Sequence, residues 1–310
     1  MTGSDVPEAD RAVSPGAARR QLGGLLRSLR ERTGLRLDQA GDHIQRSTAT
    51  LSRLENGKSV PRLVDVRALL DLYVETKASA VSKDERDRVM LLAADSRQQA
   101  WFDPFRDVIT GSMTQDHMQR YVEWETDAEE ILTHQTELVP GLMQTRSYAQ
   151  ALADLFFPDS SSTQRKRFVD FRMARQGVLN RRAVPLELRV TLREVALHRV
   201  LGSASVMVEQ LGKLADELRN GLKNVELRIV PDRLVSPEAL RGPFTVMRLP
   251  EPDEGDGDGL VYLEGAGGGD YLQNAESVER YRKDFATLWA ASLSQEESLG
   301  LVEEVADTIR

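Results

Sequence analysis

Between residues 19 and 97, apolar residues recur three or four positions apart, a spacing that predicts a series of amphipathic helices. The first helix has its apolar face at Leu22, Leu25, Leu26 and Leu29. Gly34 follows at a position where helices commonly end in a left-handed conformation, and Pro61 suits the first turn of a fourth helix. A fifth helix is expected over residues 82–96. The pattern predicts an all-α, five-helix N-terminal domain over residues 19–97, called the head below.

The second and third helices of the head are short and closely spaced. Their inward positions are Leu35, Leu37, Ala40 and Ile44 in the second helix and Leu51 and Leu54 in the third. Ser47 can cap the third helix, because its hydroxyl can accept a hydrogen bond from a backbone N–H of the first turn, and Gly57 can end it. Such a series is typical of a helix-turn-helix, and the third helix would then enter the major groove of DNA.

The outward, N-terminal half of the third helix is the predicted DNA-reading surface. The candidate base contacts are Ser47, Thr48, Ala49, Thr50 and Arg53. Arg53 is the strongest of these, because Arg pairs bidentately with guanine. The candidate phosphate contacts on the flanks are Arg36, Arg46, Lys58 and Arg62. The alternative is a helical bundle that uses the leucines only as a core and leaves Arg53 solvated. Ser47, Gly57 and the basic charge around the third helix favour DNA binding.

The rest of the chain has other patterns. Residues 1–18 mix Pro, Gly, Ser, Asp and Ala without apolar periodicity, which predicts a disordered arm. Residues 98–114 have no clear period and predict a junction. Helical patterns then cover residues 115–130, 144–155, 163–180, 203–220, 275–292 and 295–309, and strand patterns cover residues 186–192, 225–230, 244–249 and 260–263. We expect a multidomain protein with a mixed α+β C-terminal domain, called the body, over residues 115–310.

Composition and charge support this division. The chain has 310 residues, of which 40% are hydrophobic, enough for two domains. Residues 19–62 hold ten Arg or Lys against four acidic residues, which leaves 31 basic and 45 acidic residues elsewhere. A basic head on an acidic body suits DNA contact, although a solvated charged surface explains the same counts. The sequence has no Cys, no signal-like N-terminus and no apolar run of roughly 20 residues, and we expect a cytoplasmic protein without membrane contact.

The stretches LRSLRERTGL (residues 26–35) and TLSRLENGK (residues 50–58), followed by Pro61, resemble the xenobiotic-response-element family of repressor and Cro-like helix-turn-helix proteins, which have a lambda-repressor-like fold. The resemblance implies a structural salt bridge between Arg30 and Glu55. It also implies a homodimer that reads a palindromic operator in double-stranded DNA. Two positions depart from the family pattern: Arg36 stands where Ser or Thr usually caps the second helix, and Gln45 stands where the turn usually has Gly.

Several motifs are spread along the body: VPGLMQT (residues 139–145), Tyr148, RMARQGVL (residues 172–179), Glu194, GPF (residues 242–244) and VYLE (residues 261–264). With them the body resembles the antitoxin-like C-terminal domain of many actinobacterial regulators. The resemblance implies regulation of transcription, often together with a small partner protein from a neighbouring gene. It does not imply a particular ligand.

Four polar residues of the body are candidates for a ligand or partner site: Gln144, Arg172, Arg175 and Gln176. The last three share one face of a predicted helix, and Gln144 follows a Pro-Gly turn. Together they suit an anionic ligand or a carboxylate of a partner protein. The alternative, which we favour at this point, is that they hold helices together by internal hydrogen bonds.

The sequence predicts no catalytic, metal or cofactor site. Glu194 and His198 fit an ordinary contact between positions i and i+4 better than a metal pair, and no nucleophile elbow, phosphate loop or zinc-protease motif occurs. Residues 254–259 depart from a calcium loop, and the glycine-rich residues 265–269 predict a flexible turn.

The resulting hypothesis is a sequence-specific transcriptional regulator whose body senses a signal or binds a partner. One alternative is an antitoxin-like protein that captures a small partner protein and autoregulates through its head. The other, least favoured, is an enzyme fused to a DNA-binding head.

Overall fold

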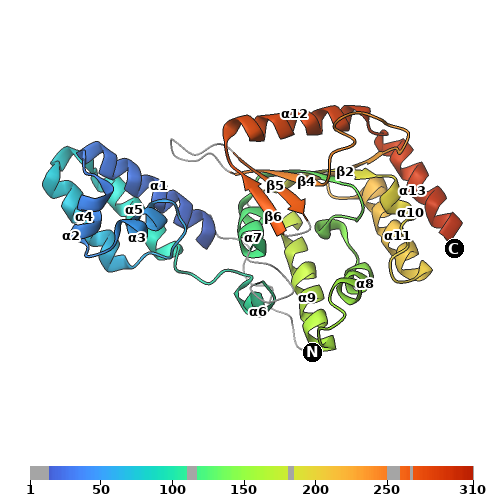
Figure 1. Cartoon of the computed structure of the whole chain (residues 1–310), viewed down its shortest axis with the longest axis horizontal. Coiled ribbons are helices and arrows are strands. Elements are labelled where there is room, and N and C mark those ends of the chain that lie inside the picture. The colour runs from blue at the N-terminus through green and yellow to red at the C-terminus, as the bar shows by residue number, and fades with distance from the viewer. Residues whose placement is uncertain (1–13, 110–116, 181–184, 250–258, 266–267, 310) are drawn as a thin grey trace. The chain divides into compact units, whose positions relative to one another are not determined.

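The computed structural model describes residues 14–109, 117–180, 185–249, 259–265 and 268–309, which form two compact units (Figure 1). Among these residues, the first unit ends at Asp103 and the second begins at Pro104. Residues 1–13, and with them most of the predicted arm, lie outside the described residues. Within the described ranges, no helix is both long enough and apolar enough to cross a membrane.

The head consists of α1 (Pro15–Thr33), α2 (Leu37–His43), α3 (Thr48–Glu55), α4 (Leu63–Thr76), the 3-10 turn η1 (Ala78–Ala80) and α5 (Lys83–Asp95). Helix α1 begins inside the segment expected to be a disordered arm, so that prediction is wrong for residues 15–18. Ser14 explains the early start, because its Oγ accepts a hydrogen bond from the Ala17 N–H at 3.1 Å and Pro15 occupies the first turn. Ala18 is fully buried, so the extra turn also contributes to the core.

One apolar core holds the five helices together. Its members include Leu22, Leu26 and Leu29 of α1, Leu51 of α3, Leu70 and Tyr73 of α4, and Val89 of α5. Gly34 and Gly57 end α1 and α3 with φ angles of 78° and 65°, as their positions in the sequence predict. Gly23 lets α1 approach the end of α3 closely, since a Cβ there would lie 2.6 Å from the Glu55 carbonyl oxygen. The close contact fixes α3 against α1.

The body is a mixed α+β unit, as predicted. Its helices and 3-10 turns are η2 (Asp103–Phe105), which straddles the boundary, α6 (Arg106–Ile109), α7 (His117–Asp127), η3 (Gly141–Met143), α8 (Arg146–Phe156), α9 (Ser162–Arg175), η4 (Gln176–Asn180), α10 (Val195–His198), α11 (Ala204–Asn220), α12 (Ala275–Ala291) and α13 (Gln295–Ile309). Its strands are β1 (Glu130–Gln135), β2 (Glu187–Arg193), β3 (Val225–Val230), β4 (Phe244–Arg248), β5 (Gly259–Gly265) and β6 (Gly268–Leu272).

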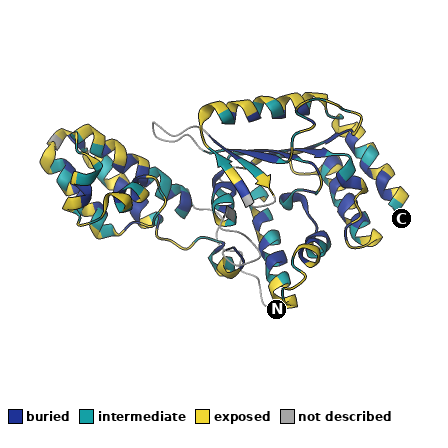
Figure 2. Cartoon of the chain, viewed as in Figure 1, coloured by how far each residue is buried: buried dark blue, intermediate teal, exposed yellow. Residues whose placement is uncertain are grey.

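The six strands form one sheet in the order β3-β2-β1-β4-β5-β6. The pairs among β1, β2 and β3 are parallel, and the other pairs are antiparallel. Helix α12 covers one face, while α8, α9 and α11 lie on the other (Figure 1). The strands are mostly buried and the outer side of α12 is exposed (Figure 2).

Four side chains form a polar row across the face opposite α12. Thr133 of β1 pairs with Thr245 of β4, Thr245 with Tyr262 of β5, and Tyr262 with Tyr271 of β6. Directly paired residues point to the same face of a sheet, so the row interrupts a surface that is otherwise apolar. Helix α7 lies over this row, because the ring of Tyr121 is 4.9 Å from that of Tyr262.

Two strands were not predicted from the sequence. Strand β1 begins where a helix was expected to end, and it carries polar residues, Thr133 and His134, at buried positions. The prediction of a flexible turn over residues 265–269 is wrong for Gly265, which ends β5, and for Gly268 and Gly269, which begin β6, whereas residues 266–267 lie outside the described residues. Gly269 there leaves room for the Tyr262 ring, since a Cβ would overlap that ring at 1.9 Å. Helix α6 lies in the stretch expected to be an irregular junction.

Candidate nucleic-acid interface and body pocket

A tight turn joins α2 to α3. Gln45 has a φ of 54° and is the one described residue other than glycine with a positive φ. Its N–H donates to the Asp42 carbonyl oxygen at 3.0 Å, and the Arg46 N–H donates to the Gly41 carbonyl oxygen at 2.9 Å. A left-handed conformation costs a residue with a Cβ roughly 1–2 kcal/mol. The absence of glycine at position 45 therefore strains the turn, but the turn still forms.

Helix α3 has its N-terminal half at the surface of the head. The Ser47 Oγ accepts a hydrogen bond from the Thr50 N–H at 3.2 Å, so the predicted cap is present, and it lies 2.9 Å from the Thr50 Oγ1. Thr48, Ala49 and Arg53 are exposed. Within the described part of the chain, the Arg53 guanidinium has no hydrogen-bond or ion-pair partner. Its five N–H donors are therefore available to an external acceptor.

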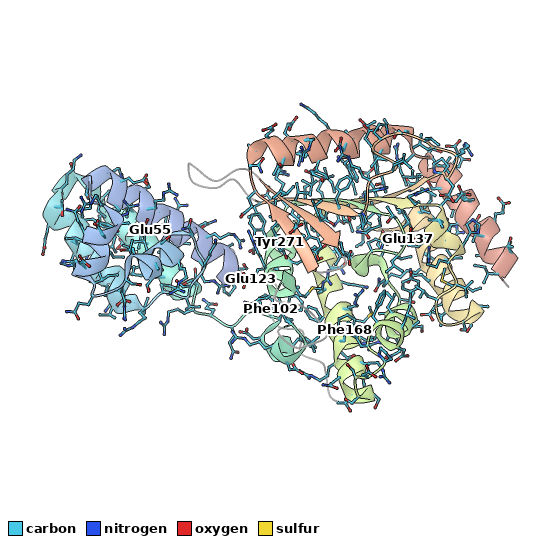
Figure 3. All side chains as sticks on the ribbon, viewed as in Figure 1. Glu55, Phe102, Glu123, Glu137, Phe168 and Tyr271 are labelled. Carbon is cyan, nitrogen blue, oxygen red and sulfur yellow. The ribbon has the colours of Figure 1, made fainter. Side chains whose placement is uncertain are left out.

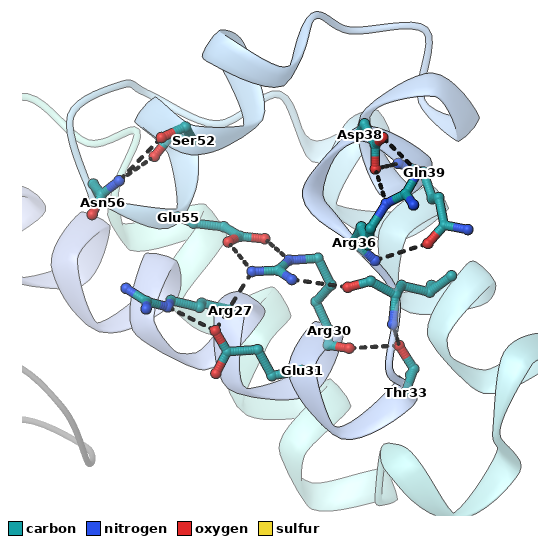
Figure 4. Close-up of polar contacts among 11 residues, drawn as sticks. Arg27, Arg30, Glu31, Thr33, Arg36, Asp38, Gln39, Ser52, Glu55 and Asn56 are labelled. Carbon is teal, nitrogen blue, oxygen red and sulfur yellow. Dashed lines mark hydrogen bonds and ion pairs between the residues drawn. The ribbon is translucent and has the colours of Figure 1, made fainter.

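Arg30 and Glu55 connect α1 to the last turn of α3 (Figure 4). The Arg30 Nε donates to Glu55 Oε1 at 2.7 Å, and the Arg30 Nη2 donates to Glu55 Oε2 at 2.9 Å. The Arg30 Nη1 donates to the Leu35 carbonyl oxygen at 2.9 Å. The two side chains are 11% and 4% exposed, and the hydrogen bond with Glu55 raises the pKa of Arg30 above its usual value. The salt bridge that the resemblance implies is thus present, and it holds α3 at one angle.

The four candidate phosphate contacts differ in their surroundings. Two form ion pairs inside the head, Arg36 with Asp38 at 2.8 Å and Arg46 with Asp65 at 3.0 Å. The Arg36 pair is exposed and appears in Figure 4. Exposed ion pairs contribute little to stability, so a phosphate can replace Asp38. Lys58 and Arg62 are exposed, and no residue in the described ranges forms an ion pair with either.

A pocket of about 120 Å³ lies in the body between the polar row of the sheet, α7 and α9. Its polar lining includes Tyr121 and Glu125 from α7, Thr133 and Thr245 from the sheet, and Arg172 and Arg175 from α9. Gln144 also lines it, whereas Gln176 does not. Three of the four polar residues that the sequence singled out in the body therefore meet at one cavity.

Arg175 forms a buried ion pair inside this pocket. Its Nε and Nη2 donate to the two carboxylate oxygens of Glu125, each at 2.8 Å, and the side chains are 8% and 2% exposed. Burial by itself lowers the pKa of Arg175, but the coulombic attraction of Glu125 and its hydrogen bonds together outweigh burial and raise the pKa. The positive charge of Arg175 is therefore already balanced within the body.

The two glutamines make hydrogen bonds to the backbone near η3. The Gln144 Nε2 donates to the Val139 carbonyl oxygen at 2.7 Å, and the Gln176 Nε2 donates to the Gly141 carbonyl oxygen at 3.0 Å. For the two glutamines, these contacts agree with the alternative favoured from the sequence, in which the polar residues hold helices together by internal hydrogen bonds. Arg172 differs, because only its Nη1 has a partner, the Gln144 Oε1 at 2.8 Å.

Comparison with known families gives two matches. Residues 21–89 match a helix-turn-helix domain, and they contain α2, α3 and the Arg30–Glu55 pair. The match indicates a DNA-binding regulator. Residues 118–304, more than half of the chain, match a domain of unknown function, DUF5753. The chain belongs to the DUF5753 family. No curated protein and no solved structure matches it.

The pocket lies within the DUF5753 match, since its lining residues run from Met118 to Glu264. Seven polar residues of the lining were not predicted as site residues from the sequence: Tyr121, Glu125, Thr133, Gln135, Thr245, Tyr262 and Glu264. The two threonines left no clear signal, because Thr133 lies between Ile131 and the polar Gln135 on its face of β1, and Thr245 has only Met247 as a same-face neighbour within β4. Glu125 left none, since its partner Arg175 is 50 positions away in the sequence.

Proposed function

We propose that this member of the DUF5753 family is a sequence-specific transcriptional regulator that reads its operator through α3. The observation that carries the proposal is the exposed, unpaired Arg53 on a helix that a buried salt bridge fixes to α1. Recognition helices enter the major groove with such residues toward the base edges. Ser47, Thr48, Ala49 and Thr50 would meet neighbouring base edges or methyl groups.

The phosphate contacts in this proposal are Arg36, Arg46, Lys58 and Arg62. Phosphate contacts fix the register of a protein on DNA without reading sequence. Regulators of this kind usually bind as symmetric dimers to half-sites about 34 Å apart. We therefore extend the proposal to a homodimer on a palindromic operator, with the body as a sensor or partner-binding domain.

The test is a genome-wide occupancy map of the wild-type chain, of Arg53→Ala and of the control Arg86→Ala. Arg86 is a half-exposed cation on α5, paired with Asp71; it lies within the matched residues 21–89 but outside α2, the turn and α3. The wild type and the control should share one discrete, roughly palindromic motif, which Arg53→Ala should lose or degrade at one base pair. Diffuse occupancy by the wild type would refute sequence-specific reading. Capture of a small partner protein would then become the better explanation of the body.

A further inference from the structure

Arg172 is an unusual cation in the pocket of the body. Its Nε is buried and has no hydrogen-bond partner within the described residues. No carboxylate in the described ranges lies within 4.0 Å of its guanidinium, although Arg175, one helical turn away, has Glu125. The guanidinium lies 4.7 Å from the centre of the ring of Phe168. Figure 3 labels Phe168, whose ring is an apolar surface. A partly buried cation with a buried, unpartnered N–H and no close counter-charge is costly, so the site suits an anion.

The pKa of Arg172 also indicates a cation without a close counter-charge. Burial and, to a smaller extent, the neighbouring charge of Arg175 together lower the pKa of Arg172 to about 10. Because this pKa is still well above 7, the guanidinium is positively charged at neutral pH. An anion placed beside Arg172 would therefore gain a charge-assisted hydrogen bond, the stronger class of hydrogen bond.

The rest of the lining limits the charge of that anion. Glu125 pairs with Arg175, so Arg172 is the one cation of the described lining without a carboxylate within 4.0 Å, and Glu264 attracts it only from a longer distance. Glu264 stands at the exposed end of β5 and also lines the pocket. A second negative charge on the ligand would meet these carboxylates without a further cation. A monoanion fits this lining better than a phosphate dianion.

The volume of the pocket and its remaining walls limit the size and shape of the ligand. Apolar walls come from Ile131 and Leu188, and hydroxyl groups come from Thr133 and Thr245. A cavity of about 150 Å³ can hold benzene, so the pocket of about 120 Å³, which is partly open, suits a ligand of similar size. A planar carboxylate matches the planar guanidinium fork.

We propose that the pocket binds a small monocarboxylate, with its carboxylate on Arg172 and its short apolar part against Ile131 and Leu188. The two threonine hydroxyls then lie on the polar side of the ligand. This inference rests on the proposed sensing role of the body. Its test measures ligand binding alone, so its failure is distinguishable from a failure to bind DNA.

The experiment uses the full chain, with sodium butyrate and sodium benzoate as probes and sodium phosphate at equal ionic strength as the competing anion. Calorimetry and the thermal unfolding midpoint report binding. We expect saturable binding of at least one carboxylate and a higher midpoint in its presence, with at least tenfold weaker binding of phosphate. No saturable response to either carboxylate, or phosphate binding of equal strength, would overturn the proposal.

Three variants locate the site. Arg172→Gln should weaken carboxylate binding at least tenfold, yet its midpoint without ligand should equal or exceed that of the wild type, because a partly buried charge without a close counter-charge is removed. Thr245→Val, which keeps the side-chain shape, should weaken binding several-fold. Arg189→Gln, which removes an exposed cation of β2 paired with Glu226, should bind as the wild type does. Wild-type affinity in both Arg172→Gln and Thr245→Val would overturn the assignment.

Discussion

The substitution Glu55→Gln tests whether the buried salt bridge fixes the recognition helix. It leaves the shape of the side chain almost unchanged but removes the negative charge beside Arg30, whose side chain is only 11% exposed. Breaking one side of a buried ion pair typically costs about 3–5 kcal/mol, because the remaining charge is stranded. For a unit as small as the head, each kcal/mol corresponds to roughly 4–8 °C in melting temperature. We therefore expect the head to lose more than about 12 °C.

The assay is hydrogen–deuterium exchange of the full chain in increasing urea, followed by mass spectrometry, since peptides from α1 and α3 report the head separately from the body. The free energy of unfolding measured in these peptides should fall by about 3–5 kcal/mol in Glu55→Gln. The control is Asp71→Asn, which removes the acid of the exposed Arg86–Asp71 pair of the head, with 40% and 56% exposure. Such a pair contributes under about 1 kcal/mol.

A second variant separates the salt bridge from general damage to the core. Replacing both partners, as in Arg30→Met with Glu55→Leu, removes both charges together and should restore much of the lost stability. A loss below about 1 kcal/mol in Glu55→Gln, equal to that of the control, would refute the reasoning. So would a double variant whose loss equals the sum of the single losses, because the two side chains would then be uncoupled.

Three further predictions follow from the contacts described above. Arg53→Ala should cost about 1–3 kcal/mol of discrimination at one base pair, whereas Lys58→Ala should weaken binding to all sequences and reduce the salt slope by about 1 in titrations at several salt concentrations. Glu125→Gln should destabilise the body by about 3–5 kcal/mol in urea unfolding, because it strands a buried guanidinium; a loss under about 1 kcal/mol would contradict the buried pair. Burial lowers the pKa of His134 from 6.5 to about 4, so the unfolded chain binds the proton more tightly and stability should fall as pH drops from about 6.5 to 4, by up to about 3 kcal/mol. His134→Gln should remove this part of the pH dependence, and the exposed His198→Gln should retain it.

The helices were largely predictable from the sequence because their apolar positions recur with the period of one face. Residues 295–309 are the clearest example, since the predicted and observed bounds of α13 are the same. Strand β1 was missed because burial of its polar residues depends on neighbours distant in sequence. Thr133, for example, is satisfied by Thr245, 112 positions away, with 2.9 Å between the two hydroxyl oxygens.

The two candidate sites also differ in how far they could be predicted from the sequence. The surface of α3 could be predicted, because its cap, its end and its exposed side chains all lie within a short stretch. At Arg36 the local pattern was incomplete: its side chain does not cap α2, and the Gln39 Oε1 instead accepts the Arg36 N–H at 2.9 Å. The pocket of the body could not be assembled in advance, because its charges balance between segments far apart in sequence. That balance is what distinguishes Arg172 from Arg175.

The close approach of α1 to α3 imposes opposite constraints on two adjacent, identical residues. Gly23 has no room for any side chain, because even a methyl group would press on the backbone of α3. Gly24 is exposed, and a Cβ there would meet nothing within 4 Å. Alanine at position 24 should improve the helix by up to about 1 kcal/mol. A saturation library of the head would therefore tolerate nearly every residue at one position and nearly none at its neighbour.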